Sequence, residues 1–281
     1  MTSPTAAQPA LANHTSQNYN EHASFVYSDK NTAPILRLLN AQSGESIVDL
    51  GCGTGQLTEK IKALSWPDAQ LSFARENGNA LGIEYTRGDI QDYRTLDASL
   101  EGRFDAVFSS ATFHWCKANP GGVVETIKWL LKPGGRAVFE FGGFQNTVGV
   151  RGALHDCLRR RGYDPAKADP WYFPTAEQYS ALLQLHGMSP SDVELHQRPT
   201  PLTTDLFGWL KTFARRTFFA EFSDLEANSM MEEVVESCRP DNYWCDAMPG
   251  LGIKPPVGAT GNEGWNVHYV RLRGSATAPS C

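Results

Sequence analysis

The segment from Ser46 to Leu64 restricts the fold of this chain more than any other part of the sequence. It begins with a run typical of a buried strand, Ser46 to Leu50, and ends with apolar residues at helical spacing. Between them lie glycines at positions 51, 53 and 55. Glycines let the backbone turn tightly and approach a ligand, and the free N–H groups of a helix start attract anions. The segment therefore predicts a strand, a ligand-binding loop and a helix.

The rest of the chain alternates short apolar runs with helical patterns, separated by turn residues. Strands are expected at 46–50, 83–85, 104–109, 136–141, 191–196 and 265–272. Helices are expected from Pro34 onward and at 56–64, 123–131, 147–161, 175–186, 204–220 and 223–238. Because strands that alternate with helices form parallel sheets, we predict an α/β, Rossmann-like fold. Its mostly parallel sheet is flanked by helices, and a helical cap follows the fifth strand.

Composition separates a short first segment from one long domain. Residues 1–16 are rich in Ser, Thr, Ala, Pro and Asn, which bury little surface, so we expect this segment to be disordered. Residues 17–281 are expected to form a single domain. Within it, residues 147–239 are predicted to be the helical cap over the substrate side.

Charge and cysteine content exclude several classes of protein. The net charge is −6 and the basic residues are scattered apart from Arg159 to Arg161, so nucleic acid is not an expected partner. The six cysteines form no CxxC pair; we interpret them as reduced thiols and expect no metal site. There is no signal-peptide pattern and no apolar run of the roughly 18 residues that a membrane span requires. The sequence predicts a soluble, cytoplasmic protein.

The run from Asp49 to Gly55 resembles the first motif of class I S-adenosylmethionine (SAM) methyltransferases. The resemblance implies that the acid and the glycines hold the methionine part of SAM. Later matches are Gly88-Asp89-Ile90, where the family contacts adenine, 104–108, like its fourth strand, and 131–135, like the turn before its fifth. Tyr19 resembles a residue that closes over the cofactor, and an aromatic side chain on the surface is the alternative. The expected SAM-binding residues are Tyr19, Asp49, Gly51, Gly53, Gly55, Asp89 and Ile90.

Four further motifs resemble a branch similar to trans-aconitate and ubiquinone-biosynthesis methyltransferases. They are 113–115, 140–143, 170–174 and 269–273. The resemblance covers roughly residues 17–275 and implies methyl transfer from SAM to a small-molecule acceptor. We favour oxygen as the methylated atom.

The acceptor side has one candidate catalytic residue. His114 follows the fourth strand, at the edge of the sheet where open α/β folds bind ligands, so it is placed to take a proton from the acceptor. Packing against Trp115 is the alternative. Trp115, Trp171 and Tyr172 are expected to line the substrate pocket, with a purely structural role as the alternative.

One feature of the family pattern is absent. The second strand of such folds ends in an acid about 20 residues after the glycines, which binds the ribose. Here 66–70 resembles the lead-in to that strand, but 71–78 already has the pattern of the following helix. Judged against the usual length of a βαβ unit, about a dozen residues are missing after Gln70. Glu76 lies at a usable distance to be the acid, but it is more easily interpreted as a solvated helical residue. A coding segment has been dropped, or the site is degenerate and binds SAM weakly.

Two other functions compete with methyl transfer. A non-methylating protein on the same fold, either a pseudoenzyme or a small-molecule cyclase, would explain a degenerate site, because a fold does not fix its chemistry. An NAD-dependent oxidoreductase would need a third glycine where Gln56 stands.

Overall fold

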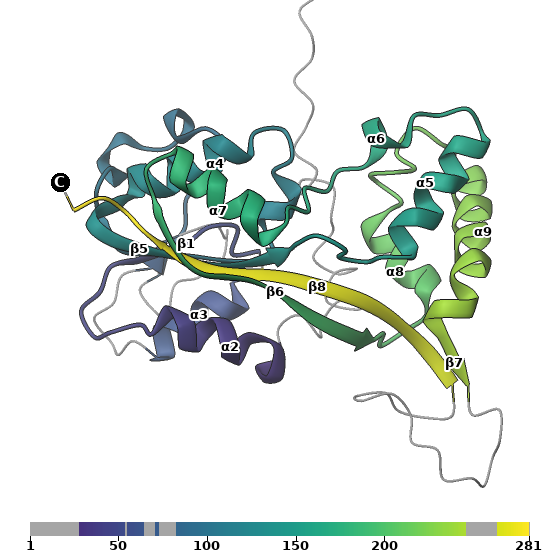
Figure 1. Ribbon diagram of the computed structural model, residues 1–281, viewed down its shortest axis with the longest axis horizontal. Coiled ribbons are helices and arrows are strands. Elements are labelled where there is room, and N and C mark those ends of the chain that lie inside the picture. The colour runs from purple at the N-terminus through teal and green to yellow at the C-terminus, as the bar shows by residue number, and fades with distance from the viewer. Residues whose placement is uncertain (1–27, 54, 65–70, 73–82, 246–262, 281) are drawn as a thin grey trace, which may run out of the picture. The chain divides into compact units, whose positions relative to one another are not determined.

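The computed structural model describes residues 28–53, 55–64, 71–72, 83–245 and 263–280 (Figure 1). The chain divides into two compact units. The first, which we call the sheet unit, comprises the described parts of Val26–Asn146, Trp171–Gln197 and Val270–Cys281. The second, the helical unit, comprises the described parts of Thr147–Pro170 and Arg198–Tyr269. None of the described helices is long and apolar enough to cross a membrane.

The strands form one mixed sheet in the order β3-β2-β1-β4-β5-β8-β6, with β7 paired to β8. Their bounds are β1 Ile47–Asp49, β2 Leu71–Ser72, β3 Ile83–Glu84, β4 Phe104–Ser110, β5 Leu131–Gly142, β6 Ser189–Pro201, β7 Tyr243–Cys245 and β8 Glu263–Thr277. The pairs β1–β2, β2–β3, β1–β4 and β4–β5 are parallel, and β8 runs antiparallel to β5. The predicted Rossmann-like fold with a mostly parallel sheet is confirmed.

Helices cover both faces of the sheet. In Figure 1, α2 (Asp29–Leu39) and α3 (Gln56–Leu64) lie on one face, and α4 (Pro120–Leu130) and α7 (Ala176–Leu185) lie on the other. Successive residues of β5 accordingly enter different cores: Val138 packs on the side of α2, and Phe139 packs on the side of α4 and α7. Strands buried on both faces carry nearly continuous apolar runs, which explains why β4 and β5 were recognisable in the sequence.

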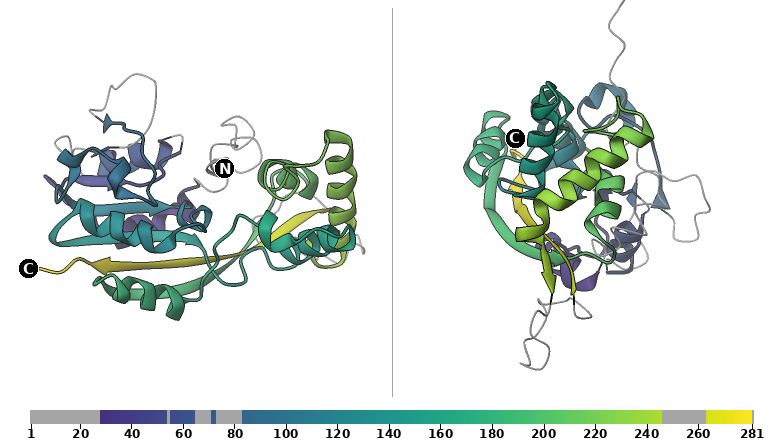
Figure 2. Two further views of the ribbon diagram at one scale, coloured as in Figure 1. Left: turned by 90° about the horizontal axis from the view of Figure 1, so that it is seen from above. Right: turned by 90° about the vertical axis from the view of Figure 1, so that its right-hand side faces the viewer.

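The helical unit contains α5 (Val150–Arg160), α6 (Pro165–Ala168), α8 (Leu206–Phe213) and α9 (Asp224–Asn242). Its first helix, α5, packs against α9, where the buried Cys157 thiol contacts the carbonyl oxygen of Met230. The long strand β8 continues past the end of β5 and carries the chain from the helical unit into the sheet unit (Figure 2). That residues 147–239 act as a cap stays a prediction.

The observed helix bounds differ from the predicted ones in two informative places. Helix α2 begins at Asp29, so Pro34 lies inside it and does not open it; proline there removes only one backbone hydrogen bond, and the acid in the first turn stabilises the helix start. The helix predicted over 204–220 ends at Phe213. The Arg215 guanidinium donates to the carbonyl oxygens of Phe219 and Phe222, 2.8 and 3.1 Å away, which holds the chain in a turn.

The second strand is present, and the helix predicted from Leu71 was wrong at its first two residues. Leu71 and Ser72 form β2 between β1 and β3, with Leu71 opposite Ile47 on one side and opposite Ile83 on the other. Two residues are too few to show an alternating pattern, so sequence periodicity missed the strand. Glu76 lies outside the described residues.

Candidate functional site

The glycine loop leaves β1 with a backbone that only glycine adopts readily. Gly51, Gly53 and Gly55 have φ angles of 76°, 56° and 81°. The loop closes through a 2.9 Å hydrogen bond from the N–H of Gly55 to the carbonyl oxygen of Cys52, and α3 starts at the next residue. The predicted strand, loop and helix are therefore all present, and the loop leads into the N-terminus of α3.

The end of β4 fixes the first glycine of the loop. The N–H of Leu50 donates to the carbonyl oxygen of Phe108 at 2.8 Å, and the Ser109 hydroxyl donates to the carbonyl oxygen of Leu50 at 2.8 Å. The Thr112 hydroxyl lies 3.2 Å from the carbonyl oxygen of Gly51. A Cβ on Gly51 would stand 2.3 Å from Cγ2 of Thr112, so no larger residue fits there without movement.

Tyr85 contacts the loop from the other side. This residue directly follows β3, and its hydroxyl would lie 3.1 Å from a Cβ on Gly55. Neither Thr112 nor Tyr85 belongs to a sequence motif, and sequence reasoning missed both. Only the strand order, which puts the ends of β3 and β4 near the end of β1, shows that they border the loop.

Asp49, the last residue of β1, is a buried acid. Its carboxylate accepts a 2.6 Å hydrogen bond from the Thr58 hydroxyl in α3. Burial raises the pKa of Asp49 to about 7, and the bond from Thr58 opposes this shift. A cationic group bound beside Asp49 would stabilise the carboxylate. The residue is therefore suited to attract a positively charged part of a ligand.

Asp89 and Ile90 form a turn after β3. The N–H of Asp89 donates to the Thr95 hydroxyl at 2.9 Å, and the Asp89 carboxylate accepts from the N–H of Gln91 at 2.9 Å. Asp89 is exposed, whereas Ile90 is half-buried against the core. The Asp89 carboxylate is therefore exposed to solvent, while the apolar side chain of Ile90 anchors the turn to the core.

His114 lies in η5 (Phe113–Trp115), the short 3-10 helix that follows β4. It is buried, and its Nδ1 accepts a 3.3 Å hydrogen bond from the N–H of Gly142 at the end of β5. A backbone N–H is always a donor, so Nδ1 carries no proton and the neutral ring carries it on Nε2. The neutral ring of His114 is therefore a hydrogen-bond donor through Nε2.

Aromatic side chains surround this histidine. Its ring centroid lies 5.2 Å from that of Trp115 and 6.0 Å from that of Phe173. Trp171 stacks on Phe173 at 5.5 Å and meets Trp115 edge-on at 6.2 Å. The N–H of Tyr172 donates to the carbonyl oxygen of His114 at 2.9 Å. The structure thus brings together all four residues that we predicted for the acceptor side.

These four residues differ in burial. Trp171 is buried, and Trp115 and Tyr172 are half-buried. Burial also raises the pKa of the Tyr172 phenol, which therefore remains protonated at neutral pH. Tyr19, the remaining predicted site residue, lies outside the described part of the chain.

Two motifs of the sequence meet as an ion cluster on neighbouring strands. In the register of β5 and β8, Glu140 pairs with Arg273 and Gly142 pairs with Arg271. The buried Glu140 carboxylate lies 3.5 Å from Nε of Arg271 and 2.6 Å from Nη2 of Arg273. The family-like residues of these motifs therefore stabilise the β5–β8 pair through charge.

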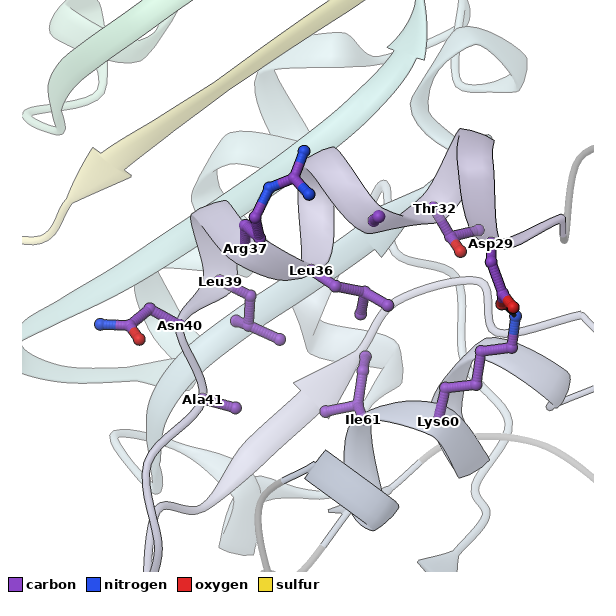
Figure 3. Close-up of a pocket in the computed structure, with 10 residues that line it drawn as sticks. Asp29, Thr32, Leu36, Arg37, Leu39, Asn40, Ala41, Lys60 and Ile61 are labelled. Atoms are coloured by element: carbon purple, nitrogen blue, oxygen red, sulfur yellow. Dashed lines mark hydrogen bonds and ion pairs between the residues drawn. The ribbon is translucent and has the colours of Figure 1, made fainter.

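A separate pocket lies between α2 and α3, away from these residues (Figure 3). It has a volume of about 670 Å³, and apolar side chains such as Leu36, Leu39 and Ile61 line it. Lys60 and Asp29 form a 2.7 Å ion pair at one end. The pocket shares no residue with the glycine loop or with the aromatic group around His114.

Comparison with known proteins agrees with this geometry. The profile of a methyltransferase domain family matches residues 48–139. An uncharacterised methyltransferase of Schizosaccharomyces pombe, C70.08c, is 31% identical over 247 residues, which cover 81% of this chain and 92% of the yeast protein. A malonyl-[acyl-carrier protein] O-methyltransferase of Acetivibrio thermocellus is 32% identical over 133 residues, 44% of each chain.

Solved structures share the fold at low sequence identity. A candidate methyltransferase of Bacillus halodurans superposes with a TM-score of 0.53 at 12% identity, covering 89% of this chain and 99% of the other. The YcgJ protein of Bacillus subtilis gives the same TM-score and identity, covering 90% and 99%. The yeast relative and the family profile, rather than the shared fold, show that the oxidoreductase hypothesis is wrong. Because the yeast relative matches over most of both sequences, and the glycine loop has the predicted geometry, the chain belongs to the class I SAM-dependent methyltransferase family.

Proposed function

We propose that this enzyme transfers the methyl group of SAM to an oxygen atom of a small acidic molecule. The single observation that carries the proposal is the hydrogen bond from Gly142 to Nδ1 of His114, within the aromatic group after β4. Because that bond occupies Nδ1, the ring would act on the methyl acceptor through Nε2. The malonyl-[acyl-carrier protein] relatives, named as O-methyltransferases, support oxygen, although this chain spans only 44% of the first of them.

The residues after β1 fit the cofactor. Gly51, Gly53 and Gly55 form a cradle without side chains in which a ligand approaches the backbone, and Asp49 attracts a cation. These residues would hold the methionine part of SAM, which carries an ammonium and a sulfonium group. Asp89 and Ile90 would contact the adenosine part.

SAM supplies an activated methyl group, so the protein mainly has to orient the acceptor and exclude water. A carboxylate oxygen reacts without losing a proton, whereas a hydroxyl must be deprotonated. For His114 to remove a proton through Nε2, its Nδ1 would have to gain one, and the bond from Gly142 would be lost. His114 is therefore better suited to hold a carboxylate oxygen than to deprotonate a hydroxyl.

The aromatic group supports a small acceptor. Trp115 and Tyr172 keep part of their surface exposed, while Trp171 is buried and in contact with Trp115 and Phe173. Rings of this kind exclude water and contact the apolar part of a ligand. Trp115 and Tyr172 would touch the acceptor, and Trp171 would fix their positions.

Label transfer tests the proposal. The protein is incubated with methyl-labelled SAM and panels of small carboxylic acids, phenols and amines, with transfer RNA as the nucleic-acid comparison. We expect label in a carboxylic acid, and its release by mild alkali, because methyl esters hydrolyse and methyl ethers and amines do not. Label in an alkali-stable product, or in RNA alone, would contradict the proposal.

The non-methylating alternative rested on the missing ribose-binding acid. Strand β2 occupies the place of the second strand in the sheet, but residues 73–82, which follow it, lie outside the described part of the chain. The same label-transfer experiment distinguishes the two, since a pseudoenzyme or cyclase would transfer no methyl group to any panel.

A further inference from the structure

Gln91 and Asn119 are 28 residues apart in the sequence and form two hydrogen bonds with each other. The backbone N–H of Asn119 donates to Oε1 of Gln91 at 3.1 Å, and Nδ2 of Asn119 donates to the carbonyl oxygen of Gln91 at 3.0 Å. We call this pair of bonds the Gln91–Asn119 clamp. It ties the turn after β3 to the start of α4.

The same Gln91 side chain also reaches Asp89. Its Nε2 lies 3.4 Å from Oδ1 of Asp89, and its backbone N–H donates to that oxygen at 2.9 Å. The amide orientation is determined by its partners, because Oε1 faces an N–H and Nε2 faces a carboxylate. Gln91 therefore connects the Asp89 carboxylate to Asn119.

Asn119 has a second role at the start of α4. Its Oδ1 accepts from the N–H of Gly122 at 3.0 Å and caps the helix. Gly122 is required there, because a Cβ at this position would lie 2.0 Å from the carbonyl oxygen of Gln91. Further along, Tyr93 stacks on Trp129 of α4 with 5.5 Å between ring centroids. The turn thus docks on α4 at two points.

We propose that Asn119 and Gln91 are positioning residues for the cofactor: the clamp fixes the Asp89 carboxylate for a hydrogen-bond donor of the adenosine part of SAM. This inference rests on the proposed role of Asp89. An exposed carboxylate alone samples several rotamers, and ordering it on binding costs free energy. Both bonds from Gln91 go to Oδ1, and no described residue donates to Oδ2, which can therefore accept from the ligand.

The variant Asn119→Asp separates the two roles of Asn119. An aspartate still caps α4 through a carboxylate oxygen, but it cannot donate to Gln91 and places negative charge beside that carbonyl. We expect the affinity for S-adenosylhomocysteine, measured by calorimetry, to fall roughly threefold to tenfold, the effect of one hydrogen bond. The thermal midpoint should fall by no more than the loss of one hydrogen bond causes, because the cap on α4 is kept.

Thr175→Ala is the matched control. Thr175 caps α7 in the same unit through the N–H of Gln178. Its loss should lower the thermal midpoint and leave the affinity for S-adenosylhomocysteine unchanged.

Gln91→Glu adds a readout that a structural role would not give. The new carboxylate keeps an acceptor for Asn119 but repels Asp89 until it is protonated. The ratio of variant to wild-type dissociation constants should therefore be large at pH 7.5 and approach one towards pH 5. A ratio that does not change with pH would count against the clamp.

The outcomes distinguish the clamp from the proposed function. If Asp89→Ala weakens binding but Asn119→Asp and Gln91→Glu bind like wild type, the clamp has no positioning role and the cofactor assignment of Asp89 stands. If Asp89→Ala also binds normally, the assignment fails and the inference fails with it. If wild type binds no S-adenosylhomocysteine, the proposed cofactor site itself is wrong.

Discussion

The Thr112 hydroxyl lies 3.2 Å from the carbonyl oxygen of Gly51, and the two residues are in contact across the ends of β1 and β4. The loop that would hold SAM is therefore shaped from outside its own motif. A larger residue in place of Gly51 would displace Thr112, which lies just after the neighbouring strand β4.

Gly51→Ala should accordingly weaken S-adenosylhomocysteine binding by at least tenfold. Alanine at φ 76° costs about 1 kcal/mol or more, and its Cβ would clash with Thr112. Gly44→Ala is the control, because Gly44 has a φ of 82° but no atom within 4 Å of a Cβ. Titration calorimetry and thermal unfolding of both variants measure the two effects. Equal behaviour of the variants would mean that the contact with Thr112 is unimportant.

The glycine loop and the central strands could be predicted because their signals are local. Glycine spacing and continuous apolar runs are read directly from neighbouring residues, as at 46–64 and in β4 and β5. Strand β2 was missed because two residues carry no period. Thr112, Tyr85 and Asn119 were missed because their roles depend on which strand and helix ends are adjacent, which no local pattern specifies.

The charged motifs illustrate the same limit. In the sequence, 140–143 and 269–273 are two separate motifs that resemble the family. That their charged side chains form one ion cluster depends on the register between β5 and β8. A shift of one residue would place Glu140 opposite Leu272 and move its partners to the other face.

Asp49→Asn should increase the stability of the fold and weaken the binding of S-adenosylhomocysteine. The pKa of Asp49 is raised from 3.8 to about 7 in the folded protein, so between these values the folded state keeps a proton that the unfolded chain has released. Wild-type stability therefore falls as pH rises through this window, by up to about 1.4 kcal/mol per pH unit, and asparagine avoids this loss. Denaturant unfolding at pH 5 and pH 8 should show the variant gaining on wild type at the higher pH.

The binding of S-adenosylhomocysteine to wild type should strengthen as pH rises towards 7, because its ammonium group favours ionised Asp49. The asparagine variant should lack this dependence and bind poorly. A variant that binds as well as wild type would remove Asp49 from the cofactor site.

Glu140→Gln should destabilise the sheet unit by about 3 to 5 kcal/mol. The substitution leaves the buried guanidinium of Arg271 and the neighbouring Arg273 without a counter-ion, which costs far more than losing a surface pair. Lys132→Gln is the control, because it breaks an ion pair near the surface. Lys132 and Asp105 are 2.7 Å apart, and their side chains are 45% and 32% exposed, so the substitution should lower the free energy of unfolding by less than about 1 kcal/mol. Denaturant unfolding measures both, and comparable losses would contradict a special role for Glu140.

His114→Asn tests whether Nε2 acts on the acceptor. The asparagine carbonyl can still accept from the N–H of Gly142, so the local backbone contact is kept, but nothing replaces Nε2. We expect turnover of the accepted carboxylic acid to fall roughly tenfold, as for one lost hydrogen bond in the transition state, with the affinity for S-adenosylhomocysteine unchanged. His186→Asn, a substitution in the same unit beside Glu125, is the matched control and should leave both unchanged.

The pH dependence of turnover distinguishes holding an oxygen from removing a proton. If His114 only donates a hydrogen bond, the turnover of wild type and of His114→Asn should depend on pH in the same way, because no step consumes the free imidazole base. If His114 is a general base, wild-type turnover should fall as the ring is protonated, and the variant should lose this dependence. Such a loss would show that the acceptor is a hydroxyl and that the bond from Gly142 breaks during the reaction. Full turnover in the variant would instead make His114 a packing residue among Trp115 and Phe173.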